Sequence, residues 1–221
     1  IYPNMPLDPV DDLSSISVGV TSPLVWVINP ALPFKTMPEF IAKVQAEPGN
    51  WRYGLPASGS IPHLVVEDTK IRHKLDMPAV PYRSTPQSLA AVISGEVPVT
   101  LDSLGASSGH IAGGRLRALA VTSAKRSERL PDVPTMLETG LDPREWVAWY
   151  AFMAPKGTPD DIIQRLNAAI NQALGEEAFA TRIRELGASP RITTPAETLA
   201  FIKAERADFG AIAKAGKIRV E

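Results

Sequence analysis

The chain has 221 residues, which is long enough for one or two domains with buried cores. It contains no cysteine, so disulfides, thiolate nucleophiles and cysteine-ligated metals are excluded. Its 23 Lys and Arg residues nearly balance 24 Asp and Glu residues, so no nucleic-acid or anionic-membrane surface is expected, and no apolar run approaches the roughly 20 residues of a membrane-spanning helix.

Short β-rich runs alternate with amphipathic segments from Ser14 to Met153. The runs predicted as strands are 16–21, 24–29, 51–54, 79–82, 97–102, 116–122 and 146–153. The helices predicted between them are 37–45, 62–75, 86–94 and 107–112. Most of the strands are mainly apolar, as expected when both faces of a sheet are covered, so the pattern predicts an α/β fold.

The chain after Met153 is predicted to be almost purely helical. Thr158 and Pro159 predict a capped helix start, followed by a buried stripe at spacing four, formed by Ile162, Leu166, Ile170 and Leu174. A second helix is predicted from Phe179, Ile183 and Leu186, ending at Gly187, and the last helix begins with a capping box from Thr194 to Glu197. These helices are interpreted as scaffold.

A loop of small residues runs from a predicted strand into a predicted helix. Its central residues are Ala57, Ser58, Gly59, Ser60 and Ile61. Such a loop presents backbone N–H groups at the positive end of a helix dipole, which favours a bound anion such as a carboxylate. The alternative is that Ser60 simply caps the helix and Gly59 serves the turn, and the sequence leaves both interpretations open.

Two further loops follow predicted strands and are candidate ligand contacts. The first contains Tyr82, Arg83 and Ser84, and the second contains Asp102 and Ser103. Ligands bind at the carboxyl ends of strands in open α/β sheets, so these two loops and the 57–61 loop could converge on one crevice. The fork of donors on Arg83 suits a carboxylate. Arg83 could equally be solvated, and Asp102 could cap the next helix.

Of the four tryptophans, only Trp149 is placed toward a cleft; core packing is the simpler explanation for the others.

Enzyme chemistry finds little support in the motifs. The three histidines, His63, His73 and His110, lack the spacing of a metal site. Ser58 or Ser60 with His63 could suggest a serine hydrolase, but the Gly-x-Ser-x-Gly elbow is absent. No dinucleotide or Walker motif occurs either, so no cofactor is expected.

The chain resembles the solute-binding proteins of the tripartite tricarboxylate transporter family, the Bug or TctC type, over essentially its whole length. The motifs that carry the resemblance are DPVDD at 8–12, WRY at 51–53, GSIPHL at 59–64, VPY at 80–82, GRLRALAVTS at 114–123, RS at 126–127, LPDVPT at 130–135, APKGTP at 154–159 and LN at 166–167. Several ordered motifs of this length are far more specific than one short pattern.

The resemblance implies a type II-like periplasmic binding protein with two lobes and a ligand cleft between them. It also implies binding of a small di- or tricarboxylate, amino acid or aromatic acid without turnover, and delivery to the membrane subunits of a transporter. The second lobe would be 22–124, and the first lobe would combine 1–21 with 125–221. The ligand loop of the second lobe maps onto 57–61, with support from 82–84 and 102–103.

The start of the chain departs from the family pattern. Family members begin with a further glycine-rich segment that supplies the first-lobe half of the carboxylate clamp, and residues 1–20 do not match it. The expectation is therefore an incomplete first lobe or a homodimer that covers it. An alternative is a truncated or degenerate paralogue that keeps the fold without tight binding. Ala57 stands where glycine is usual, which leaves the identity of the acid open.

Overall fold

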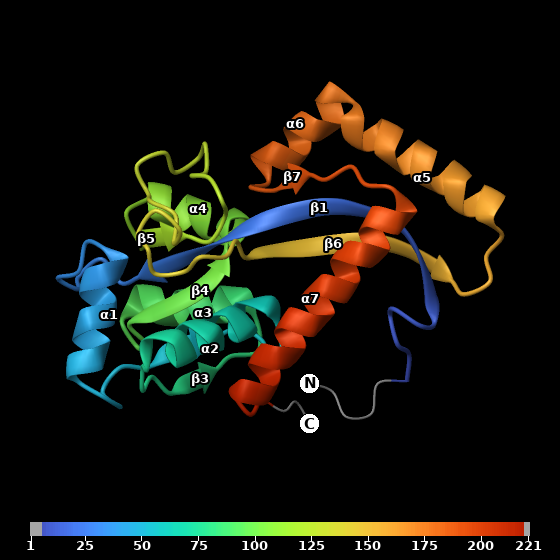
Figure 1. Cartoon of the computed structure of the whole chain (residues 1–221). Coiled ribbons are helices and arrows are strands. Elements are labelled where there is room, and N and C mark those ends of the chain that lie inside the picture. The colour runs from blue at the N-terminus through green and yellow to red at the C-terminus, as the bar shows by residue number, and fades with distance from the viewer. Residues whose placement is uncertain (1–5, 219–221) are drawn as a thin grey trace. The chain divides into compact units, whose positions relative to one another are not determined.

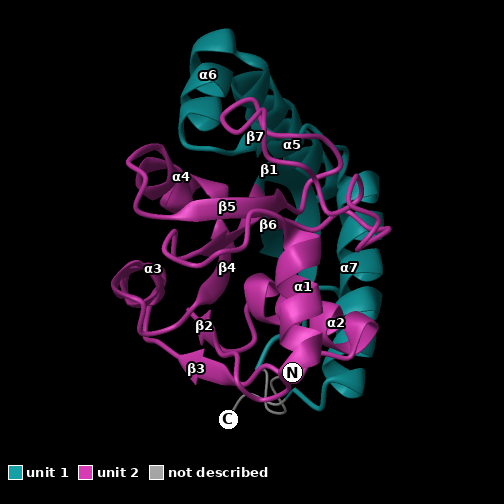
Figure 2. Ribbon diagram, turned by 90° about the vertical axis from the view of Figure 1, so that its left-hand side faces the viewer, with its two compact units in different colours: residues 1–22, 149–221 teal, residues 23–148 magenta. Residues whose placement is uncertain are grey.

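The computed structural model describes residues 6–218, and the chain divides into two compact units (Figure 1, Figure 2). Unit 1 comprises residues 1–22 and 149–221, and unit 2 comprises residues 23–148. The beginning of the predicted first lobe, residues 1–5, lies outside the described residues.

The change of unit at 148 differs from the predicted change of lobe at 124. Residues 125–148 belong to unit 2 because backbone hydrogen bonds tie them to the end of a unit 2 strand. The Val121 N–H donates to Pro134 O and the Trp146 N–H donates to Thr122 O, each at 2.9 Å. These long-range bonds have no signature in the local sequence.

The sheet of unit 2 is mixed, with the strand order β3-β2-β4-β1-β5. Its strands are β1 (Leu13–Ile28), β2 (Tyr53–Leu55), β3 (Ala79–Pro81), β4 (Val99–Ser103) and β5 (Arg117–Val121). Strand β2 runs parallel to both β3 and β4, whereas β1 runs antiparallel to β4 and β5. The α/β class predicted from the sequence is confirmed.

One strand, β1, replaces the two strands predicted at 16–21 and 24–29. Its first part pairs with β7 (Ser189–Pro190) at Val20 and Thr21, and its second part pairs with β4 from Leu24 onward. Pro23 lies between these two ladders. Its missing N–H therefore interrupts neither of them, and the strand continues through a residue that usually ends one.

Four helices cover the sheet of unit 2: α1 (Met37–Ala46), α2 (Ile61–His73), α3 (Thr85–Ser94) and α4 (Leu104–Ala112). Figure 2 shows α3 and α4 on one side of this sheet and α1 and α2 on the other. Val25 and Val27 of β1 pack with Leu89 of α3 and Leu104 of α4 in one buried cluster. Successive strand residues face opposite sides, so the fully buried Trp26 points toward the α1 and α2 side.

Unit 1 contains the first part of β1, paired with β6 (Val147–Pro155) and β7. Its helices are α5 (Asp160–Gly175), α6 (Glu177–Glu185) and α7 (Pro195–Ala215). Ile16 of β1, Ala154 of β6 and Ile163 of α5 form a small buried cluster. The predicted capping box of α7 is confirmed, because the Thr194 hydroxyl accepts from the Glu197 N–H while the Glu197 carboxylate accepts from the Thr194 N–H.

The predicted buried stripe of α5 is confirmed at Leu174, and Ile170 packs against the buried cluster, but the stripe is wrong at Leu166. Ile163, Asn167 and Leu174 are the buried positions, while Leu166 is 40 % exposed. The polar Asn167 turns inward because its amide donates to Ile16 O at 2.7 Å and Thr193 O at 2.8 Å. Long-range hydrogen bonds thus determine which side of α5 faces inward at Asn167, where the spacing of apolar residues had predicted Leu166 to be buried.

The predicted Thr158 cap and the apolar stripe of α6 are also corrected. The Thr158 hydroxyl donates to Pro155 O, and α5 begins at Asp160 without a side-chain cap. On α6 only Ile183 of the predicted stripe is buried, since Phe179 and Leu186 are exposed. Among residues 6–218, no helix is long and apolar enough to cross a bilayer.

Candidate anion site

Three loops leave the sheet of unit 2 at the same edge. The parallel register aligns Leu55 of β2 with Pro81 of β3, and Gly54 of β2 with Thr100 of β4. Two loops, 56–60 and 82–84, and the last two residues of β4, 102–103, therefore lie side by side at the carboxyl ends of the strands. We call this edge, made of these three segments, the anion edge. The structure thus places side by side the three segments that the sequence analysis expected to converge.

Each loop leads directly into a helix, so three helix N-termini lie at the anion edge. The N-cap residues are Ser60 for α2, Ser84 for α3 and Ser103 for α4. The first amides of a helix have no intrahelical partner, and the helix dipole places partial positive charge there. Three such ends at one sheet edge make a region suited to a carboxylate.

Several backbone donors at the anion edge have no partner within residues 6–218. They are the N–H groups of Ala57, Ser58, Ile61, Thr85, Gln87, Leu104 and Gly105. Sequence reasoning missed the last four. The predicted helix start after Ser84 carried the signal for Thr85 and Gln87, whereas the helix after Asp102 was predicted to begin only at residue 107 and in fact begins at Leu104. The expectation that Gly59 and Ser60 also offer free amides is wrong. The Gly59 N–H donates to His63 Nδ1 at 3.0 Å, and the Ser60 N–H donates to Ala57 O at 3.3 Å.

The three N-cap serines differ in how much of their hydroxyl is available. The Ser60 hydroxyl caps α2, accepting from the His63 N–H, and donates to Ala57 O at 2.7 Å. The simpler interpretation of Ser60 as a cap is therefore confirmed. Ser103 caps α4 by accepting from the Ala106 N–H. Ser84 makes no side-chain capping bond, so its hydroxyl remains available at the start of α3.

Asp102 is a buried carboxylate at the anion edge, with 3 % of its surface exposed. Its Oδ1 accepts from the Ser103 N–H at 2.6 Å and from the Thr85 hydroxyl at 3.3 Å. Its Oδ2 is buried and has no hydrogen-bond partner in the described part of the chain. Burial raises the pKa of Asp102 to about 6, while these two hydrogen bonds act in the opposite direction. Oδ2 can therefore accept one more hydrogen bond or carry a proton.

Arg83 and Tyr82 leave the same loop in different roles. Arg83 is exposed, and its guanidinium has no ion-pair or hydrogen-bond partner within residues 6–218. The Tyr82 hydroxyl donates to Glu96 at 2.8 Å, and burial together with this bond raises the pKa of Tyr82 to about 12. Glu96 follows the carboxyl end of α3, so the Tyr82 hydroxyl lies at the opposite end of that helix from Ser84.

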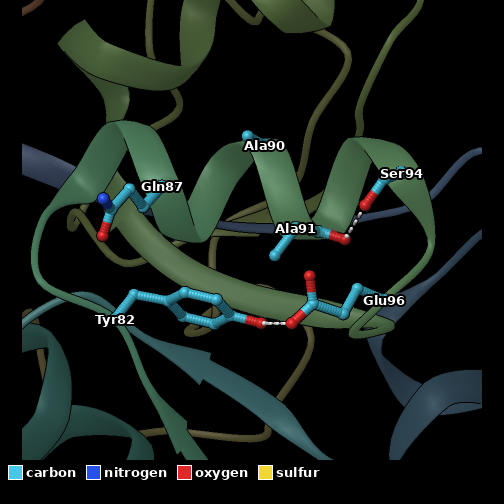
Figure 3. A pocket seen from close by; sticks show the side chains of 6 residues that line it. All are labelled: Tyr82, Gln87, Ala90, Ala91, Ser94 and Glu96. Atoms are coloured by element: carbon cyan, nitrogen blue, oxygen red, sulfur yellow. Dashed lines mark hydrogen bonds between the residues drawn. The ribbon is translucent and has the colours of Figure 1, made fainter.

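The Tyr82 ring contributes to a shallow depression along α3 with a volume of about 430 Å³ (Figure 3). The depression is lined by Tyr82, Gln87, Ala90, Ala91, Ser94 and Glu96. Figure 3 shows the ring extending beneath the helix toward Glu96. The side chain of Tyr82 is thus directed along α3, and its backbone alone remains in the loop of the anion edge.

Trp149 lies in unit 1, whereas the other predicted contacts lie in unit 2. Its indole N–H donates to Glu205 of α7 at 3.0 Å, and its ring packs edge-on against Phe201 at 5.4 Å between centroids. These contacts hold the indole on α7. Its role as a ligand contact stays a prediction.

The serine-hydrolase arrangement is not present in the described residues. The His63 ring accepts from the Gly59 N–H, and the Ser60 hydroxyl is directed to Ala57 O. A general base must instead be hydrogen-bonded to its nucleophile. Residues 6–218 also contain no group of three or more His, Asp or Glu side chains that could hold a metal ion.

The family model of the tripartite tricarboxylate transporter family receptor, TctC, matches residues 1–218. The chain belongs to this family. Among the receptor family's curated members, BugT of Bordetella pertussis is 38 % identical over 207 residues, which cover 93 % of this chain and 63 % of BugT. A protein encoded between tcbD and tcbE in Pseudomonas sp. strain P51 is 30 % identical, covering 84 % of this chain and 56 % of that protein. The chain thus spans less than two thirds of the length of these relatives.

Solved structures of similar proteins agree with the fold. The R. palustris protein Rpa4515 with adipate is 32 % identical with a TM-score of 0.89, covering 99 % of this chain and 73 % of that protein. MatC from Rhodopseudomonas palustris with bound malate is 25 % identical with a TM-score of 0.82, covering 95 % of this chain and 72 % of MatC. The periplasmic binding protein BugD, at 24 % identity and a TM-score of 0.85, covers 100 % of this chain and 75 % of BugD.

These matches confirm the type II-like periplasmic binding fold that the resemblance implied. The matched family is one of receptors. The comparisons give no support to the expected homodimer, and the roles of the individual predicted contacts remain predictions.

Proposed function

We propose that this chain is the solute-binding part of a tripartite tricarboxylate transporter and binds a small carboxylate at the anion edge. The observation that carries the proposal is the convergence of three helix N-termini and seven unpartnered amides on one edge of parallel strands. Fixed amide dipoles stabilise a carboxylate without reorganising. The acid would be a di- or tricarboxylate, an amino acid or an aromatic acid.

The charges around the anion edge favour a ligand with more than one polar group. The exposed Arg83 guanidinium can take a carboxylate with two parallel hydrogen bonds. The Ser84 hydroxyl, which makes no capping bond, can form a hydrogen bond with a second polar group of the same ligand, whereas Asp102 Oδ2 is buried. The adipate bound by Rpa4515 and the malate bound by MatC support the class of ligand.

The cellular setting follows from the same family. We place the chain in the periplasm, where it would deliver its acid to the membrane subunits of the transporter. The match to a transporter receptor family and the similarity to BugD, a periplasmic binding protein, support this placement.

Calorimetric titration with adipate, malate, citrate, aspartate, glutamate and nicotinate tests the proposal. At least one of these acids is expected to bind. Arg83→Ala should weaken that binding about 10- to 100-fold, because a charge-assisted hydrogen bond contributes about 1.5–3 kcal/mol. Absence of binding by all six acids would favour the alternative of a paralogue that keeps the fold without tight binding.

A matched pair of charge insertions separates the anion edge from the rest of unit 2. Ser58→Asp places a carboxylate beside the free amides, where it should compete with the ligand and lower affinity at least tenfold. Ser94→Asp places the same charge at the opposite end of α3 and should leave affinity unchanged. Equal effects of the two variants would refute the location of the site.

A further inference from the structure

The 56–60 loop is held by hydrogen bonds within itself and by one from the helix that follows it. Gly59 has φ of 75°, in the left-handed region that favours glycine. Ala57 O accepts both the Ser60 N–H and the Ser60 hydroxyl. The Gly59 N–H has no backbone partner and donates instead to the His63 imidazole at 3.0 Å.

This hydrogen bond determines the protonation state of the His63 ring. Nδ1 can accept only when it carries no proton, so the ring is neutral with its proton on Nε2. Burial lowers the pKa of His63, Lys70 lowers it further and Glu67 acts in the opposite direction, which keeps the ring neutral near pH 7. If Nδ1 were protonated, its N–H would face the Gly59 N–H. Two donors cannot form a hydrogen bond with each other, so this contact would be lost.

We propose that His63 is the positioning residue of the anion edge: its neutral imidazole accepts the Gly59 N–H and fixes the turn that presents the free Ala57, Ser58 and Ile61 amides. This inference rests on the proposed function for its consequence in binding, but the hydrogen bond itself can be tested without a ligand. His63 does not contact the acid in this arrangement. It sets the direction of the amides that do.

The charged groups near His63 form hydrogen bonds with other residues, and Nδ1 accepts from the Gly59 N–H. On α2 the charged groups that act on the imidazole are Glu67 and Lys70, which pair with each other at 2.6 Å. Glu67 also accepts from the Tyr53 hydroxyl of β2 at 2.9 Å. Strand β4, which packs against α2, has Asp102 as its charged residue, and Asp102 is bonded to Thr85 and Ser103 instead.

Two substitutions at position 63 distinguish the effect of the hydrogen bond to the Gly59 N–H from the effect of the size and charge of the His63 side chain. In His63→Asn the side-chain oxygen can occupy the place of Nδ1 and accept the Gly59 N–H, whereas His63→Ala leaves that N–H without a partner. His63→Ala should weaken acid binding about 3- to 10-fold, as expected for one lost hydrogen bond, and His63→Asn should stay within about twofold of wild type. His73→Asn, at the other end of α2, is the control and should leave affinity unchanged.

Nuclear magnetic resonance of the wild-type protein tests the contact directly. The Gly59 amide resonance should titrate with the same midpoint as the His63 ring, below the ordinary value of 6.5, and should not titrate in His63→Asn. A Gly59 amide that ignores the His63 titration, or equal affinities of His63→Ala and His63→Asn, would overturn the proposal. If wild type binds none of the acids, the proposed function fails while the resonance measurement still decides whether His63 holds the turn.

Discussion

Replacing Asp102 by asparagine should change how the stability of the protein depends on pH. Burial raises the pKa of Asp102 from 3.8 to about 6 in the folded state, whereas an unfolded chain keeps the ordinary value. The folded state therefore binds more protons than the unfolded state between these two values. Stability from this group is fully present below about pH 4 and is lost as the pH rises through about 6. The difference of about 2 pH units corresponds to about 3 kcal/mol.

The asparagine amide adds a second effect that does not depend on pH. Its oxygen can still accept from Ser103 and Thr85, but its NH₂ replaces the unpartnered Oδ2 and costs about 1–3 kcal/mol at every pH. The free energy of unfolding of Asp102→Asn at neutral pH alone therefore does not test the pKa of Asp102. The decisive quantity is the change in unfolding free energy between about pH 4 and about pH 7, compared between variant and wild type.

Urea unfolding at these two pH values measures the effect. Wild type should lose about 2–3 kcal/mol more than Asp102→Asn on going from about pH 4 to about pH 7. Asp132→Asn removes a negative charge from an exposed position and controls for the general effect of net charge. Parallel pH profiles of wild type and Asp102→Asn would refute the assignment of Asp102 as a buried carboxylate without a second partner.

Four further substitutions test the packing within each unit by urea unfolding. Gly54→Ala places a Cβ 2.6 Å from the Ser88 hydroxyl oxygen and should lower the free energy of unfolding by about 1–3 kcal/mol. Gly109→Ala on α4 meets open space and should raise it by about 0.5–1 kcal/mol. The opposite order would contradict this geometry. Arg117→Lys should cost about 1–3 kcal/mol, because the guanidinium donates to three backbone carbonyls that one ammonium cannot span; wild-type stability would argue against this contact. Asn167→Leu should cost about 1–3 kcal/mol, since it removes the side-chain donor to Ile16 O of β1 and one of the two donors to Thr193 O, which keeps Asn171; a stabilised variant would contradict the inward orientation of Asn167.

Local features of this protein followed from the sequence because they depend on residues a few positions apart. The Thr194–Glu197 capping box, the left-handed Gly187 at the end of α6 and the alternation of strands and helices all belong to this kind. The ordered motifs also determined the family. The candidate loops followed from the same reasoning, since each lies between a short strand and a helix.

Tertiary structure alone decided how those loops are arranged and which of their groups are free. The parallel pairing of β2 with β3 and β4 aligns residues far apart in the chain, and no local pattern carries that register. The Gly59 N–H is occupied by His63, and the Tyr82 hydroxyl is held by Glu96, because side chains from the following turn or helix reach them. The sequence thus determined that a helix follows each of these strands, and long-range pairing determined that the three helix N-termini lie at one edge of the sheet.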